Sequence, residues 1–155
     1  MTALNKFGFK FGRYFPWPFG HALTWLLFRE RCANPAKSFD RETREGLRPP
    51  ADEALMSQPE VRELCVQTER EAFRHGIKAM AWDVRLITRP WGFQLEKIKP
   101  PVHIWHGTED NLTSVAMAQY LAGKIPHSRL TIYPGEAHML LFTHWEEILS
   151  RLIDV

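Results

Sequence analysis

The sequence predicts an α/β fold in which a helical region comes first and two parallel strands with flanking helices follow. The strands are indicated by two short apolar runs rich in β-branched and aromatic residues, 102–106 and 130–133, each followed by a turn that contains glycine. The helices are indicated by apolar residues at helical spacing before, between and after these runs. A strand, a helix and a second strand in succession should form a right-handed crossover, so that both strands run parallel.

The helical region is expected to span residues 1–95, and the segment that holds the strands to span residues 96–155. Apolar periodicity, proline and glycine predict helices in these parts of the first region: 21–31, 34–50 in part, 51–56, 60–76 and 77–86. The amphipathic helix at 60–76 has this apolar stripe, which we expect to face inward: Val61, Leu64, Cys65, Thr68 and Ala72. Trp82 and Trp91 are expected to pack in the core, with the lining of an apolar pocket as the alternative.

The segment 101–141 carries the residues with the clearest chemistry. Its first strand is followed by a polar turn that contains Asp110, and its second strand by a turn that leads into His138. A helix from about Ser114 to Lys124 connects the strands, with Ser114 as its N-cap. Because the strands run parallel, both turns should lie at the same edge of the sheet, which is where open α/β sheets bind ligands. We therefore expect Asp110 and His138 within hydrogen-bonding reach of each other.

The motif HGTED, which ends at Asp110, and the motif YPGEAH, which ends at His138, together resemble the carboxyl-terminal part of the α/β-hydrolase fold. In that fold the order along the chain is nucleophile, acid, histidine, with the acid and the histidine each following a late strand. The resemblance covers residues 52–155 well. It implies that Asp110 is the triad acid, which fixes the tautomer of the histidine, and that His138 is the general base. Glu109 is the fallback acid.

The same resemblance implies hydrolysis of an ester, amide or related bond in a small, partly apolar substrate, with no cofactor. Residues 1–95 would form a helical cap, and residues 96–155 the carboxyl-terminal segment of the hydrolase core. A nucleophile on a GxSxG turn is missing. None of the following residues has that context: Ser38, Ser57, Ser114, Ser128, Ser150, Cys32 and Cys65. We therefore expect a fragment that carries the acid and the base but is inactive until an amino-terminal half completes it.

Two alternatives remain open. Two parallel strands cannot cover their own faces and edges, so the chain could be a non-catalytic, truncated paralogue that acts as a binding protein or associates with itself through the exposed sheet edge. A membrane-associated helical protein is the other alternative, and it rests on the aromatic segment 7–28. Proline, glycine and charged residues divide that segment, so we expect no transmembrane helix.

Two departures from the hydrolase pattern concern the turns. Ala137 stands where glycine usually precedes the histidine, and a positive φ there would be strained. Residues 112–113 are Leu-Thr, where a β-branched residue and proline are common.

A metal site is not expected. His103 and His106 should point to opposite faces of a strand, so they cannot converge with Asp110 on one ion.

Composition excludes some function classes. The 155 residues are 45% hydrophobic and 25% charged, which is typical of a globular domain. A net charge of +2 without a block of like charges gives no reason to expect nucleic acid as a partner. Cys32 and Cys65 show no metal or redox spacing, so buried thiols and a cytoplasmic location are expected.

Overall fold

The computed structural model of the chain describes residues 17–153. These residues form two compact units: one holds residues 17–47 and 58–92, and the other holds residues 48–57 and 93–153. Most of the aromatic segment on which the membrane alternative rests lies outside the described residues or has side chains that are not described. No helix within residues 17–153 is long and apolar enough to cross a membrane.

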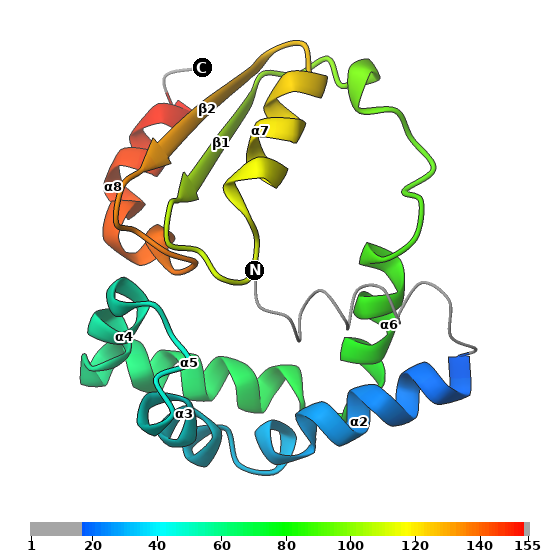
Figure 1. Cartoon of the computed structure of the whole chain (residues 1–155), viewed down its shortest axis with the longest axis vertical. Coiled ribbons are helices and arrows are strands. Elements are labelled where there is room, and N and C mark those ends of the chain that lie inside the picture. Colours follow the sequence, from blue (N-terminus) through cyan, green and yellow to red (C-terminus); the bar gives the residue numbers. More distant parts are fainter. Residues whose placement is uncertain (1–16, 154–155) are drawn as a thin grey trace. The chain divides into compact units, whose positions relative to one another are not determined.

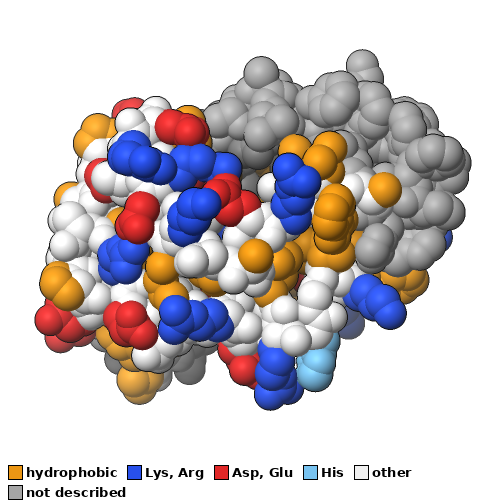
Figure 2. Space-filling model, turned by 90° about the horizontal axis from the view of Figure 1, so that it is seen from below, with side chains coloured by type: hydrophobic (Ala, Val, Ile, Leu, Met, Phe, Trp, Pro, Cys, Tyr) orange, Lys and Arg blue, Asp and Glu red, His pale blue; other side chains and the backbone are white. Residues whose placement is uncertain are grey.

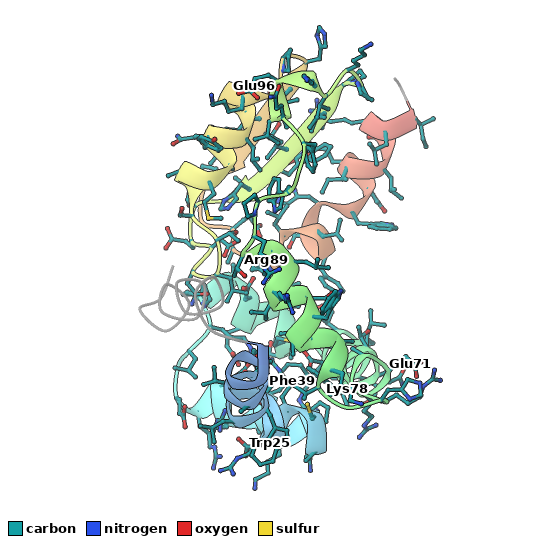
Figure 3. The ribbon with its side chains drawn as sticks, turned by 90° about the vertical axis from the view of Figure 1, so that its right-hand side faces the viewer. Trp25, Phe39, Glu71, Lys78, Arg89 and Glu96 are labelled. Atoms are coloured by element: carbon teal, nitrogen blue, oxygen red, sulfur yellow. The ribbon has the colours of Figure 1, made fainter. Side chains whose placement is uncertain are left out.

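The first unit is entirely helical within its described residues (Figure 1). Its helices are α2 (Trp17–Ala33), α3 (Pro35–Arg44), α5 (Pro59–Ala72) and α6 (Lys78–Ile87). Helix α2 packs against the other three, and α3 also packs against α5. The buried apolar side chains of this unit are Phe39, Val66, Ile77 and Ala81. Figure 3 shows the position of Phe39 near the middle of this unit and of Trp25, which is half-exposed, at its margin.

Charged groups link three of these helices. The guanidinium of Arg31 on α2 lies 4.9 Å from the centre of the Phe39 ring and forms ion pairs with Glu42 and Glu69. Helix α3 begins at a side-chain cap, because the oxygen of Asn34 accepts a hydrogen bond from the backbone N–H of Lys37 at 3.0 Å. On the face shown in Figure 2, basic and acidic side chains are interspersed, with hydrophobic side chains between them.

The predicted inward face of α5 was wrong. Val66 is the buried residue of this helix, at 1% exposure, whereas Leu64 is 51% exposed. The inward face is turned because α5 contacts both α2 and α3. The prediction that Trp82 and Trp91 pack in the core was also wrong, since they are 49% and 54% exposed. Helix α6 buries the small side chain of Ala81 instead.

The second unit contains the sheet (Figure 1). Its elements are α4 (Pro50–Met56), the short 3₁₀ helix η1 (Leu95–Lys97), β1 (Val102–Gly107), α7 (Val115–Lys124), β2 (Ser128–Tyr133) and α8 (Leu140–Ile153). The two strands are parallel, with His106 opposite Ile132 and Gly107 opposite Tyr133. Helices α7 and α8 lie on opposite sides of this sheet (Figures 1 and 3). The predicted α/β class, with helices followed by two parallel strands and flanking helices, is confirmed.

Helix α8 is tied to the sheet through the last residue of β2. The hydroxyl of Tyr133 donates a hydrogen bond to Glu147 at 2.8 Å, and its ring stacks on His144 at a centroid distance of 3.9 Å. His144 has non-helical backbone angles and marks a kink in α8. These contacts fix the start of α8, which follows directly on the turn that carries His138.

Helix α4 was predicted as part of the helical region, yet its segment, 48–57, belongs to the unit that contains the sheet. This places Asp52 of α4 beside the turn after β2, as described below. The functional division into a cap, 1–95, and a core segment, 96–155, stays a prediction.

Candidate functional site

The turns after β1 and β2 are hydrogen-bonded to each other. The backbone N–H of Thr108 donates to the carbonyl oxygen of Tyr133 at 3.1 Å, and the N–H of Glu109 donates to that of Glu136 at 2.9 Å. In return, the N–H of Gly135 donates to the hydroxyl of Thr108 at 2.9 Å. The two turns therefore form one rigid structure at the carboxyl edge of the sheet, as two parallel strands allow.

Close packing of the two backbones requires glycine at the end of β1. A Cβ atom on Gly107 would lie 2.2 Å from the carbonyl oxygen of Glu136, which is far inside contact distance. The strain expected at Ala137 does not occur, because no described residue other than glycine has a positive φ. Gly135, with φ of 78°, makes the reversal two residues earlier, and Ala137 is fully buried.

Asp110 and His138 meet as predicted. The Nδ1 atom of His138 lies 2.9 Å from Oδ2 of Asp110, which is hydrogen-bonding distance. The Asp110 side chain is 5% exposed and the His138 side chain 48% exposed. The carboxylate is thus enclosed, while the imidazole opens to solvent on its other side.

Asp110 is held by its own turn. Its Oδ1 atom accepts hydrogen bonds from the backbone N–H groups of Leu112 and Thr113 at 2.8 and 2.9 Å, and its Oδ2 atom accepts one from the hydroxyl of Thr113 at 2.8 Å. Sequence reasoning treated Leu112 and Thr113 only as a departure from a family pattern. The available signal was the spacing Asp-x-x-Thr, because an aspartate often accepts from the backbone two and three residues further on.

His106 lies behind this pair and is 8% exposed. Its Nδ1 atom is 2.8 Å from the carbonyl oxygen of Gly107, and its Nε2 atom is 3.2 Å from the hydroxyl of Thr113. Thr113 has a single hydroxyl proton, so if it donates to Asp110 it can only accept from His106. The carbonyl oxygen of Gly107 also only accepts, so a neutral His106, with one N–H, donates either to Thr113 or to Gly107. Thr113 links His106 to Asp110.

The environment of Asp110 changes its acidity in two directions. Burial raises the pKa of Asp110, but hydrogen bonds from His138, from Thr113 and from the N–H of Leu112 more than compensate. The net pKa of this carboxyl is below its ordinary value. Asp110 is therefore an ionised acceptor at neutral pH.

This lowered pKa makes stability depend on pH. An aspartate with a depressed pKa in the folded state contributes stability above its unfolded value of about 3.9, and that contribution is lost as the pH falls through the folded value. We therefore expect the free energy of unfolding of the wild-type chain to fall more steeply below about pH 4 than that of the Asp110→Asn variant. Urea unfolding across this range measures both slopes, and equal slopes would contradict the expectation.

The other predicted residues lie apart from the pair. Glu109, the fallback acid, is exposed, and none of its hydrogen bonds among the described residues reaches His138. Within residues 17–153, no hydroxyl or thiol bonds to the Nε2 atom of His138. Several serine hydroxyls bond locally to backbone carbonyls instead: Ser57, Ser128 and Ser150. The thiols of Cys32 and Cys65 are partly buried.

Comparison with known proteins gives a weak sequence similarity. No family model matches the chain, and no solved structure matches it significantly. The chain is 31% identical over 65 residues to the pimeloyl-[acyl-carrier protein] methyl ester esterase of Aromatoleum aromaticum, an α/β hydrolase. The match covers 42% of this chain and 26% of the esterase, so the chain matches about a quarter of the length of that curated relative. The similarity is weak, and it supports a resemblance to hydrolases of the α/β superfamily.

Proposed function

We propose that Asp110 and His138 are the acid and the base of a Ser–Asp–His type triad that hydrolyses an ester, amide or related bond. The observation that carries this proposal is the 2.9 Å hydrogen bond between Asp110 and Nδ1 of His138, made by a buried carboxylate to a half-exposed imidazole. A carboxylate at Nδ1 favours the tautomer with its proton on Nδ1. The Nε2 atom then has its lone pair available for a proton.

In this mechanism Nε2 of His138 removes the proton from a hydroxyl or thiol as that group attacks the substrate carbonyl. The imidazolium formed is stabilised by the charge of Asp110, which its hydrogen bonds keep ionised. Nε2 next returns the proton to the leaving alkoxide or amine, so the histidine ends the step as it began. Water repeats the cycle on the acyl intermediate.

The nucleophile in this proposal comes from an amino-terminal half of an α/β-hydrolase sheet, which residues 96–155 would complete and residues 1–95 would cap. Incomplete packing around the sheet supports this. Helix α8 leaves these apolar side chains exposed: Leu141, Phe142, Trp145, Leu149, Leu152 and Ile153. Burying one such side chain stabilises a protein by about 1.5–3 kcal/mol. The same surface is also what a non-catalytic binding protein or a self-associating chain would use.

The substrate class is proposed from the chemistry of the pair alone. A general base and its acid serve acyl transfer from esters and amides, and they do so without a metal or cofactor. The curated relative is named for a methyl ester, which favours a small ester for the first assays. Glu109 has no role in this mechanism.

Complementation tests the proposal. The 155-residue chain is co-expressed with an amino-terminal α/β-hydrolase half that bears a GxSxG turn, and the co-eluting complex is assayed with p-nitrophenyl acetate. We expect turnover that the chain alone lacks and that His138→Ala lowers by about 10³-fold or more. His127→Ala is the matched control, because His127 precedes β2 at the opposite end of the strand, and it should leave the rate unchanged.

A co-eluting complex whose rate is the same with and without His138 would contradict the proposal and favour the non-catalytic binding alternative. Turnover by the chain alone that depends on His138 would show that the nucleophile lies within its own residues.

A further inference from the structure

A second buried carboxylate lies beside the site. Asp52, on the short helix α4, is 5% exposed and belongs to the same compact unit as the sheet. Its Oδ1 atom accepts a hydrogen bond from the backbone N–H of Met139 at 2.9 Å, and its Oδ2 atom accepts one from the N–H of His138 at 3.3 Å. These partners are 87 and 86 residues away along the chain.

The two N–H groups lie in the turn just before α8, which begins at Leu140. N–H groups at this point have no partner inside the helix and must be satisfied from outside. An ionised carboxylate satisfies both, because each of its oxygens accepts. An amide of the same shape would offer one acceptor and would place its own N–H₂ against the second N–H group. Two N–H donors that face one side chain therefore favour aspartate over asparagine at position 52.

The backbone held by Asp52 is the backbone that carries the imidazole of His138. On the amino-terminal side of His138, the chain is fixed by the buried Ala137 and by the hydrogen bonds between the two turns. On the other side, Asp52 is the hydrogen-bond acceptor for His138 and Met139. The side chain of His138 makes one hydrogen bond within the described residues, to Asp110. Its direction therefore depends on how the main chain is held.

We propose that Asp52 is a positioning residue for His138. By holding the N–H groups of His138 and Met139, it directs Nδ1–H of the imidazole toward Asp110 and so keeps the tautomer with a free Nε2. This rests on the proposed function for its catalytic meaning. Asp52 itself touches neither the reacting proton nor the substrate.

A purely structural role for Asp52 would make a different prediction. If Asp52 only attached α4 to its unit, its loss would lower stability and leave the imidazole of the folded protein unchanged. The tautomer of His138 separates the two roles, because it reports on the hydrogen bond to Asp110 and not on stability.

The test uses the full chain labelled with ¹⁵N, and imidazole tautomers are read from two-bond ¹H–¹⁵N spectra at about pH 8, where an ordinary histidine is neutral. The wild-type His138 is expected mainly in the Nδ1–H form. Asp52→Asn should lower the ratio of Nδ1–H to Nε2–H by about fivefold, the factor that corresponds to one ordinary hydrogen bond. Asp52→Glu, which keeps the charge, should restore part of the ratio.

Two control variants show how far the tautomer ratio of His138 can change. Glu53→Gln removes the next carboxylate on α4, which bonds to Arg48 at 2.8 Å, and should leave the ratio unchanged. Asp110→Asn should abolish the preference for Nδ1–H. A folded Asp52→Asn chain with the wild-type ratio would overturn the proposal.

Should Asp52→Asn fail to fold, the tautomer ratio of the folded Asp52→Glu chain decides, and a ratio equal to that of the wild type would overturn the proposal. Hydrogen exchange in the wild-type chain then tests the two hydrogen bonds themselves. The amides of His138 and Met139 are expected to exchange at least about tenfold more slowly than unprotected amides. Exchange at the unprotected rate would overturn the proposal.

The tautomer is measured without nucleophile or substrate, so this result is independent of the complementation assay. A shifted tautomer with no complemented hydrolysis would refute the proposed function and leave the link between Asp52 and His138. Complemented hydrolysis with an unshifted tautomer would support the proposed function and refute the positioning role of Asp52.

Discussion

Replacing Gly107 by alanine is expected to destabilise the sheet-containing unit by about 3 kcal/mol or more, at the upper end of the cost of overpacking. The added Cβ would meet three backbone atoms of the other turn, the oxygen and carbon of Glu136 at 2.2 and 2.4 Å and the nitrogen of Ala137 at 2.7 Å. Backbone atoms cannot rotate away as a side chain can. The turns must therefore separate, which breaks the bond between the N–H of Glu109 and Glu136.

The control is Gly123→Ala in α7, where an added Cβ has nothing within 4 Å. Glycine inside a helix costs up to about 1 kcal/mol relative to alanine, so this variant should be slightly more stable than the wild type. Urea unfolding followed by circular dichroism compares the two variants, and the imidazole signals show whether His138 still meets Asp110. Equal stability of the Gly107→Ala and wild-type chains would mean that the two turns are further apart than described.

The Asp110–His138 pair could be predicted from the sequence, because it depends on local sequence patterns. Each strand is an apolar run that ends at a turn, and the crossover between them fixes a parallel pair. That arrangement places Asp110 and His138 at one edge without further information. Their contact at 2.9 Å confirms this step.

The supporting residues were missed for two different reasons. Thr113 is three residues from Asp110, and its role follows from turn geometry that a comparison with family patterns obscures. Asp52 could not have been found by pattern, because its partners are more than eighty residues away. An aspartate in the first turn of a helix is also favoured there by the helix dipole alone, so it carries no signal of a distant contact.

The helical unit shows the same limit of local reasoning. Periodicity predicted its helices, but the buried face of α5 is set by which neighbours it contacts. Val66 is buried and Leu64 is exposed, although leucine is the larger apolar side chain. Burial in a small helical unit therefore follows tertiary contacts rather than the hydrophobicity of single residues.

Asp110→Asn is expected to lower the turnover number of the complemented protein by about 10⁴-fold, as loss of the acid does in Ser–His–Asp enzymes. The amide oxygen of asparagine can keep the bonds that Oδ1 of Asp110 accepts from Leu112 and Thr113. Its N–H₂ group then takes the place of Oδ2 and faces Nδ1 of His138, which must become an acceptor. The proton moves to Nε2, and the base is lost without a change in the fold.

Glu109→Gln is the matched control, since it removes one carboxylate charge at the neighbouring position. Glu109 is exposed and makes no bond to His138 within the described residues. We therefore expect its turnover number to stay within about twofold of the wild-type value, because exposed charges have small effects. Initial rates with a p-nitrophenyl ester, on complexes that co-elute and unfold like the wild type, measure both variants. A large loss in Glu109→Gln together with an active Asp110→Asn would instead identify Glu109 as the acid.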